Sequence, residues 1–210
     1  PRESEAAYHF SNTALVQGRS SSVTSTSVNF GGGVARNDVR ARFTDEGGSL
    51  ALNGLYVLHD AQHCDNHTFI DHATPNCTSL ELFKGILDAR SQGIFYGKIL
   101  VRKDAQKTNA RQTNKNLLLS NDAFADSTPG LEILADDVRC SHGSTVGQLD
   151  ENAVFYLRSR GIDESAARTL LTYAFAGEII NQVKVASMRI RLDQLILSRL
   201  PGSDVIREAL

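Results

Sequence analysis

Apolar and polar residues alternate along most of residues 1–150. In the run VRARFT, Val39, Ala41 and Phe43 would lie on one face of an extended strand, and the residues between them on the other. The same texture recurs in SLALNGLYVLHD, SLELFKGILD, GIFYGKILVRKD and NKNLLLS. These runs contain many β-forming residues and lack helical periodicity, so they predict a β-strand architecture.

Turn-forming residues separate these runs at intervals of about 16 to 28 residues. The signals are Gly31–Gly33, Gly47-Gly48, Pro75-Asn76, Gly93, Thr108-Asn109 and Pro129-Gly130. Such spacing suits a β-sandwich or a β-solenoid whose coils carry one or two strands each. Periodicity alone does not choose between the two.

The pattern becomes helical after Asp150. Asp150 and Asp163 are placed to cap two helices at their N-termini, and Gly161 is placed to end the first. A third helix is predicted from an apolar stripe that ends at Pro201-Gly202. The stripe consists of Val185, Met188, Leu192, Leu195 and Ile196. We therefore expect a β core over residues 1–150 and a helical subdomain over residues 151–210, docked on the core or on another protein.

Composition narrows the function only modestly. The formal net charge of −2 gives no bulk attraction to nucleic acid or to an anionic membrane, and no apolar run is long enough to span a bilayer. The start, PRESEAAYHF, has no signal-peptide pattern, and its lack of Met indicates a processed chain or a fragment. The three cysteines follow no CxxC spacing, which favours a reducing cytoplasm.

Cys140 and His142 are the most suggestive pair of side chains. They stand two positions apart in DDVRCSHGSTVGQLDE, so a strand would put both on one face, roughly 6 to 7 Å apart. This spacing allows a structural role, a shared metal or cluster, or a nucleophile with its base. The last would need a third orienting group, and no hydrolase signature surrounds the nearby Asp136, Asp137 and Asp150.

A second histidine-rich stretch is LHDAQHCDNHTFIDHA. It holds His59, His63, His67 and His72, together with Cys64, Asp65 and Asp71. On a helix, three of these histidines would form a row, but the flanking residues alternate as in strands. We expect His63, Asp65 and His67 on one outer face. A metal site here would need three or four ligands to converge.

One resemblance is specific. Residues 114–162, NKNLLLSNDAFADSTPGLEILADDVRCSHGSTVGQLDENAVFYLRSRGI, resemble the C-terminal signature of SufD-type members of the SufB/SufD family. This family supplies scaffold subunits of the Suf iron–sulfur cluster assembly machinery. Residues 29–73 are similar to the family more loosely. SufB-type members resemble the chain too, but they carry an acidic EHEA-like stretch where this sequence has CSHGS.

The resemblance implies an all-β core, a right-handed parallel β-helix (β-solenoid), followed by a small C-terminal α-helical subdomain. It implies a non-enzymatic scaffold that pairs with a SufB-like subunit through its last coils and docks a SufC-like ABC ATPase through its helices. The matching Cys140 and His142 would face SufB, with His142 as a ligand and Cys140 as a supporting thiol. They would serve a transient iron or a nascent iron–sulfur cluster shared with SufB. Without SufB, the chain could pair with itself as a homodimer.

Three other hypotheses stay open at this point. A SufB-type subunit of the same complex would share the layout. A β-solenoid enzyme acting on polysaccharide would need a groove of Asp, Lys and Arg side chains. A Cys–His hydrolase would need an activated thiol at Cys140.

Overall fold

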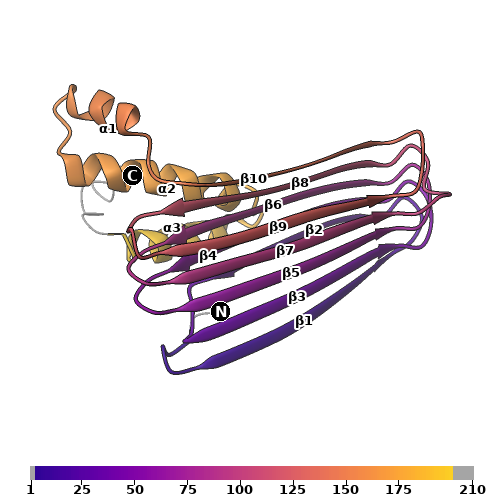
Figure 1. Ribbon diagram of the computed structural model, residues 1–210, viewed down its shortest axis with the longest axis horizontal. Coiled ribbons are helices and arrows are strands. Elements are labelled where there is room, and N and C mark those ends of the chain that lie inside the picture. Colours follow the sequence, from indigo (N-terminus) through magenta and orange to yellow (C-terminus); the bar gives the residue numbers. More distant parts are fainter. Residues whose placement is uncertain (1–2, 201–210) are drawn as a thin grey trace.

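Within residues 3–200, ten strands precede three helices (Figure 1). The computed structural model describes residues 3–200. The strands are β1 Tyr8–Gln17, β2 Ser22–Asn29, β3 Val34–Phe43, β4 Ser49–Leu58, β5 His63–His72, β6 Thr78–Leu87, β7 Gln92–Val101, β8 Asn109–Leu118, β9 Phe124–Ile133 and β10 Arg139–Gly147. The helices are α1 Glu151–Arg158, α2 Glu164–Ile180 and α3 Ala186–Leu197.

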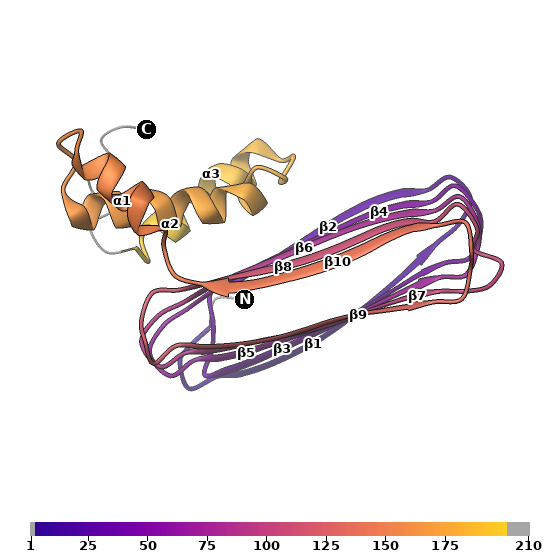
Figure 2. The same ribbon diagram turned by 45° about the horizontal axis from the view of Figure 1, so that its top comes forward.

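Consecutive strands lie in opposite sheets. One five-stranded sheet has the order β1-β3-β5-β7-β9, and the other has the order β10-β8-β6-β4-β2. All strand pairings are parallel. Because consecutive strands belong to different sheets, the chain crosses from one sheet to the other after every strand (Figure 2). The fold is therefore a parallel β-solenoid of about five turns, as the resemblance implied, and a β-sandwich is excluded.

Side chains repeat their direction from coil to coil. Val34 pairs with His63, and His63 with Gln92, a step of 29 residues each time. Because parallel strands in register keep the same face inward, equivalent residues stack in rows. The alternation predicted for VRARFT is confirmed, since Val39, Ala41 and Phe43 all point into the core.

Polar side chains also form part of the interior. The Nδ2 of Asn116 donates to the Oδ1 of Asn114 at 2.7 Å, and both residues are buried on β8. The hydroxyl of Tyr56 donates to Asn116 at 2.5 Å from two coils away. β8 therefore carries amide side chains that point into the solenoid.

The helix boundaries follow the predicted capping residues. The side chain of Asp150 accepts a hydrogen bond from the backbone N–H of Asn152, at 2.9 Å. The side chain of Asp163 accepts hydrogen bonds from the backbone N–H groups of Ser165 and Ala166. Gly161 has a φ of +87°, a left-handed conformation that glycine adopts without strain.

The predicted apolar stripe on α3 is buried only along the second half of the helix. Ile196 is buried, and Leu192 and Leu195 pack beside it. Val185 and Met188 instead have 58% and 51% of their surface exposed, because α2 and the β-solenoid cover only the second half of the helix. Pro201-Gly202 lies outside the described residues, and the division into domains 1–150 and 151–210 stays a prediction.

The helices lie over the outer face of the β2–β10 sheet (Figure 2). An apolar cluster joins the two layers; it contains Phe30, Leu55, Val57 and Ile86 from the solenoid and Ala176, Ile179, Ile180, Ile196 and Leu200 from the helices. Lys84 on β6 adds a polar anchor, because its amine donates to the carbonyl of Phe175 at 2.8 Å and pairs with Glu178. The ammonium also lies 4.0 Å from the centre of the Phe175 ring.

We predict that the two halves of this ion pair differ in their effect on stability. Only 3% of the Lys84 side chain is exposed, so Glu178→Gln leaves a desolvated cation without its carboxylate. This should lower the free energy of unfolding by about 1–3 kcal/mol. Lys84→Met removes the charge and keeps the packing, so it should cost less. Urea denaturation of both variants tests this, and a larger loss for Lys84→Met would contradict it.

Candidate functional site

Cys140 and His142 lie on β10, the edge strand of its sheet. Cys140 pairs with Ala110 and His142 with Gln112, and both partners on β8 are buried inside the solenoid. The two side chains therefore share one face of the sheet, as the two-residue spacing predicted, and the structure shows that this face is the inward one. Cys140 is half-buried against the core, whereas His142 is exposed at the end of the solenoid.

The facing strand completes this end layer. On β9, Ala125 and Leu131 pack against the core from the opposite sheet. The hydroxyl of Ser144 on β10 donates to that of Ser127 on β9 at 2.7 Å, which ties the two edges together. We call this layer, formed by the inward faces of β9 and β10, the open end.

Nucleophilic catalysis finds little support at Cys140. Burial raises the pKa of the Cys140 thiol, with a smaller opposing effect from a backbone hydrogen bond with Ala110. A raised pKa keeps the thiol protonated at neutral pH, which is the reverse of activation. Among residues 3–200, no cluster of three metal-ligating side chains includes Cys140 or His142. The pair offers a thiol and an imidazole, which are suitable iron ligands but too few to hold a cluster.

The upstream histidines do not converge. His63 and His67 point to the outer face of β5, as predicted, where His67 contacts Asp65 at 2.9 Å and stacks on Tyr96. His72 is on the same strand but fully buried, with its Nε2 2.8 Å from the hydroxyl of Ser79. The structure thus separates these side chains into an outer and an inner group.

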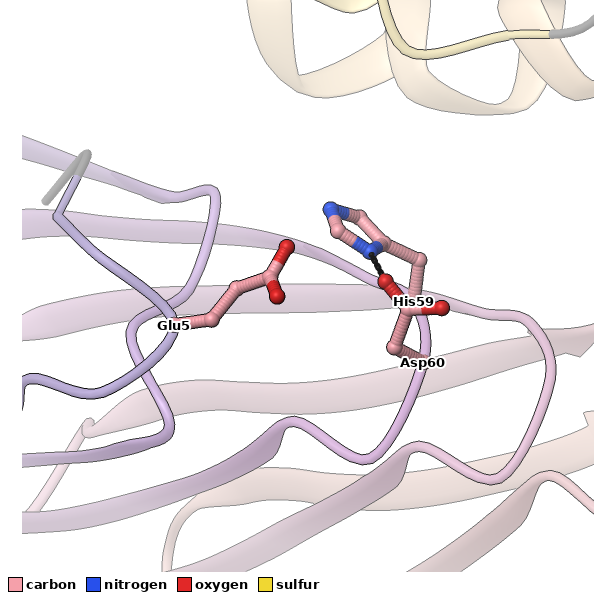
Figure 3. Close-up of side chains that lie close together, drawn as sticks. All are labelled: Glu5, His59 and Asp60. Atoms are coloured by element: carbon pink, nitrogen blue, oxygen red, sulfur yellow. Dashed lines mark hydrogen bonds and ion pairs between the residues drawn. The ribbon is translucent and has the colours of Figure 1, made fainter.

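His59 belongs to a different group, with Glu5 and Asp60 (Figure 3). These three residues form the one cluster of three metal-ligating side chains within the described range 3–200. However, the Nδ1 of His59 lies 2.6 Å from Asp60, and its Nε2 lies 2.5 Å from the guanidinium of Arg199. A cation here would meet the positive charge of Arg199, so we assign no metal site to this group.

A buried polar pair was missed by the sequence reasoning. The Nε2 of Gln112 donates to the Oε2 of Glu81 at 2.7 Å, and both side chains are enclosed in the core. Burial raises the pKa of Glu81 to about 7, and the neighbouring Thr68 and Gln112 offset this only in part.

The local pattern conceals this pair. In SLELFKG, alternation suggests that Leu80 points inward, yet Leu80 is 50% exposed and Glu81 is buried. The pairing of Glu81 with Leu52 of the preceding coil sets the inward side. Alignment of each run with the preceding coil is the signal that could have found it.

Comparison with known proteins decides the family. Residues 1–175 match the family described as the SufBD core domain of the SUF system for FeS cluster assembly. The chain belongs to the SufBD family. Its SufBD relatives include the iron–sulfur cluster assembly protein SufD of Escherichia coli (strain K12), 36% identical over 95% of this chain and 47% of that protein.

Two further SufBD-family proteins extend the comparison. The protein slr0076 of Synechocystis is 40% identical over 94% of this chain and 44% of its own length. ML0594 of Mycobacterium leprae is 38% identical over 88% of this chain and 49% of its own. The chain spans about half the length of the curated relatives it matches. No helix within residues 3–200 has both the length and the apolar character needed to cross a membrane.

We predict opposite pH effects from two buried groups. Burial raises the pKa of Glu81 from 4.5 to about 7, so its contribution to stability is lost as pH rises through that window. Burial lowers the pKa of His72 from 6.5 to about 4, with a smaller opposing effect from Asp71, so its contribution is lost as pH falls through that window. Where the two windows overlap, from pH 4.5 to 6.5, the two effects on the free energy of unfolding largely cancel in the native chain.

Single variants should expose each effect. Relative to the native chain, Glu81→Gln should gain stability as pH rises, reaching on the order of 3 kcal/mol above pH 7. His72→Gln should instead make stability fall more steeply with rising pH. Urea denaturation between about pH 4 and 8 measures both slopes, and a pH-independent difference between Glu81→Gln and the native chain would contradict the first.

Proposed function

We propose that this chain is the core of a SufD-type, non-enzymatic scaffold subunit for iron–sulfur cluster assembly in the cytoplasm. The observation that carries the proposal is the open end, where Cys140 and His142 lie on an unpaired strand edge. Membership of the SufBD family and the similarity to a protein named SufD support the same role.

The open end is suited to a partner with the same architecture. β9 and β10 each present one edge whose backbone groups pair with no strand among residues 3–200. Such edges favour pairing with the edges of another chain. A SufB-type subunit would satisfy these backbone groups and bring its own side chains beside Cys140 and His142. In its absence, two copies of this chain could pair through the same edges.

The chemistry of the pair fits iron as cargo. A thiol and an imidazole bind iron, and two donors cannot complete the coordination of a cluster. We therefore place His142 as one ligand to iron or to a nascent cluster, with Cys140 as a supporting thiol and the remaining ligands on the SufB-type partner. Transfer of such cargo requires a transient site rather than a closed one.

The helices provide a second surface for a partner. Phe155 and Tyr156 of α1 are 71% and 56% exposed, and Met188 and Ile190 of α3 are similarly exposed. Large apolar side chains on a helical surface are typical of protein interaction sites. We assign this surface to a SufC-type ABC ATPase, whose ATP hydrolysis would move the paired scaffolds.

Substitution of His142 tests the site. In a reconstituted complex with SufB- and SufC-type partners, His142→Ala should reduce iron and acid-labile sulfide at least several-fold, because one ligand is lost. His67→Ala, on the outer face of the neighbouring sheet, is the matched control and should leave both unchanged. Cluster content equal to that of the native complex in His142→Ala would remove His142 from the mechanism.

A pull-down tests the helical surface. Phe155→Ser in the full-length protein should weaken capture of the SufC-type ATPase by about tenfold, since a large exposed apolar side chain at an interface contributes on the order of 1–2 kcal/mol. Leu80→Ser, at an apolar position on β6 that is 50% exposed, is the control. Equal capture by both variants would show that the ATPase binds elsewhere.

A further inference from the structure

Glu81, Gln112 and His142 form one row across three coils. Glu81 on β6 pairs in register with Gln112 on β8, and Gln112 pairs with His142 on β10. All three side chains are on the inward side of the sheet. Neighbouring strands lie about 4.8 Å apart, so the Gln112 side chain sits between the buried carboxylate and the exposed imidazole.

The amide of Gln112 has one end engaged and one end free. Its Nε2 donates to Glu81, while its Oε1 has no hydrogen-bond partner among residues 3–200 although it is buried. Above its pKa of about 7 the Glu81 carboxylate only accepts hydrogen bonds, so at about pH 8.5 it fixes the NH2 group of Gln112 toward itself. The carbonyl oxygen is then the acceptor left over, next to the strand that carries His142.

The opposite sheet leaves room for this arrangement. Gly97 on β7 faces Gln112, and a Cβ atom there would lie 2.4 Å from the Nε2 of Gln112. Any larger residue would displace the amide from Glu81. Glu81, Gln112 and Gly97, on three different strands, therefore together accommodate the buried and only partly hydrogen-bonded amide of Gln112. An apolar residue at this position would pack in the core at a lower cost in free energy.

We propose that Gln112, held by Glu81, is a positioning residue for His142. Within the described residues, the Oε1 of Gln112 has no hydrogen-bond partner. In the proposed arrangement the exposed ring of His142 turns toward it and donates one ring N–H, which selects one tautomer and leaves the lone pair of the other nitrogen facing the open end. Histidine ligands to metals commonly donate their second ring N–H to such an acceptor, which fixes the ring orientation. The benefit of this tautomer for iron binding rests on the proposed function, whereas the hydrogen bond itself does not.

The tautomer of His142 is directly measurable. Full-length protein labelled with ¹⁵N-histidine is examined by long-range ¹H–¹⁵N correlation at about pH 8.5, where an ordinary imidazole is neutral. The native protein should show a single tautomer at His142. Gln112→Met, which keeps the length of the side chain and removes the acceptor, should show the averaged mixture of a free imidazole. The signals of His67, on the outer face of β5, serve as the internal control and should not change.

A second variant covers the case in which Gln112→Met does not fold. Glu81→Gln keeps the volume but can donate as well as accept, so the amide of Gln112 is no longer fixed and His142 should again show both tautomers. Unchanged His142 signals in a folded variant of either kind would overturn the proposal.

Metal binding separates this inference from the proposed function. In the complex with a SufB-type partner, Gln112→Met should weaken binding of Fe²⁺ by roughly 10- to 100-fold. A changed tautomer together with native cluster content in His142→Ala would leave the positioning role standing and refute the ligand role. Loss of cluster in His142→Ala together with an unchanged tautomer in Gln112→Met would support the ligand role of His142 and refute the positioning role of Gln112.

Discussion

The parallel hydrogen-bond ladder is the constraint on which the rest of the structure depends. Each inner strand of the solenoid, from β3 to β8, satisfies its backbone groups by pairing with the strands of the preceding and following coils, two elements away in sequence. That pairing fixes the register, and the register decides which side chain of each coil stacks inside. The apolar rows and the buried polar row of Glu81 and Gln112 are both consequences of it.

The same constraint gives the open end its character. Within residues 3–200 the ladder stops at β9 and β10, which leaves backbone donors and acceptors there without a strand partner and inward-facing side chains without a covering coil. Cys140 and His142 are such side chains. Under the proposed function, a second chain that continues the ladder would also complete the ligand set, which would link assembly to cargo binding.

The helices depend on the outer face of the solenoid in turn. Strand residues such as Leu55 and Ile86 point outward yet are buried, because α2 and α3 cover them. Lys84 is retained among them as a cation whose partners, Glu178 and the carbonyl of Phe175, come from α2. The first half of α3 and one face of α1 keep large apolar side chains exposed to solvent.

Local sequence determined the strands, the helix caps at Asp150 and Asp163, and the shared face of Cys140 and His142, because these depend on neighbours within a few residues. Only the tertiary structure decided that this shared face points inward at an edge, that Glu81 rather than Leu80 is buried, and that Val185 and Met188 face solvent. The physical reason is the period of two in a strand. Alternation defines two faces, and only the register with the adjacent coil determines which of them meets the core.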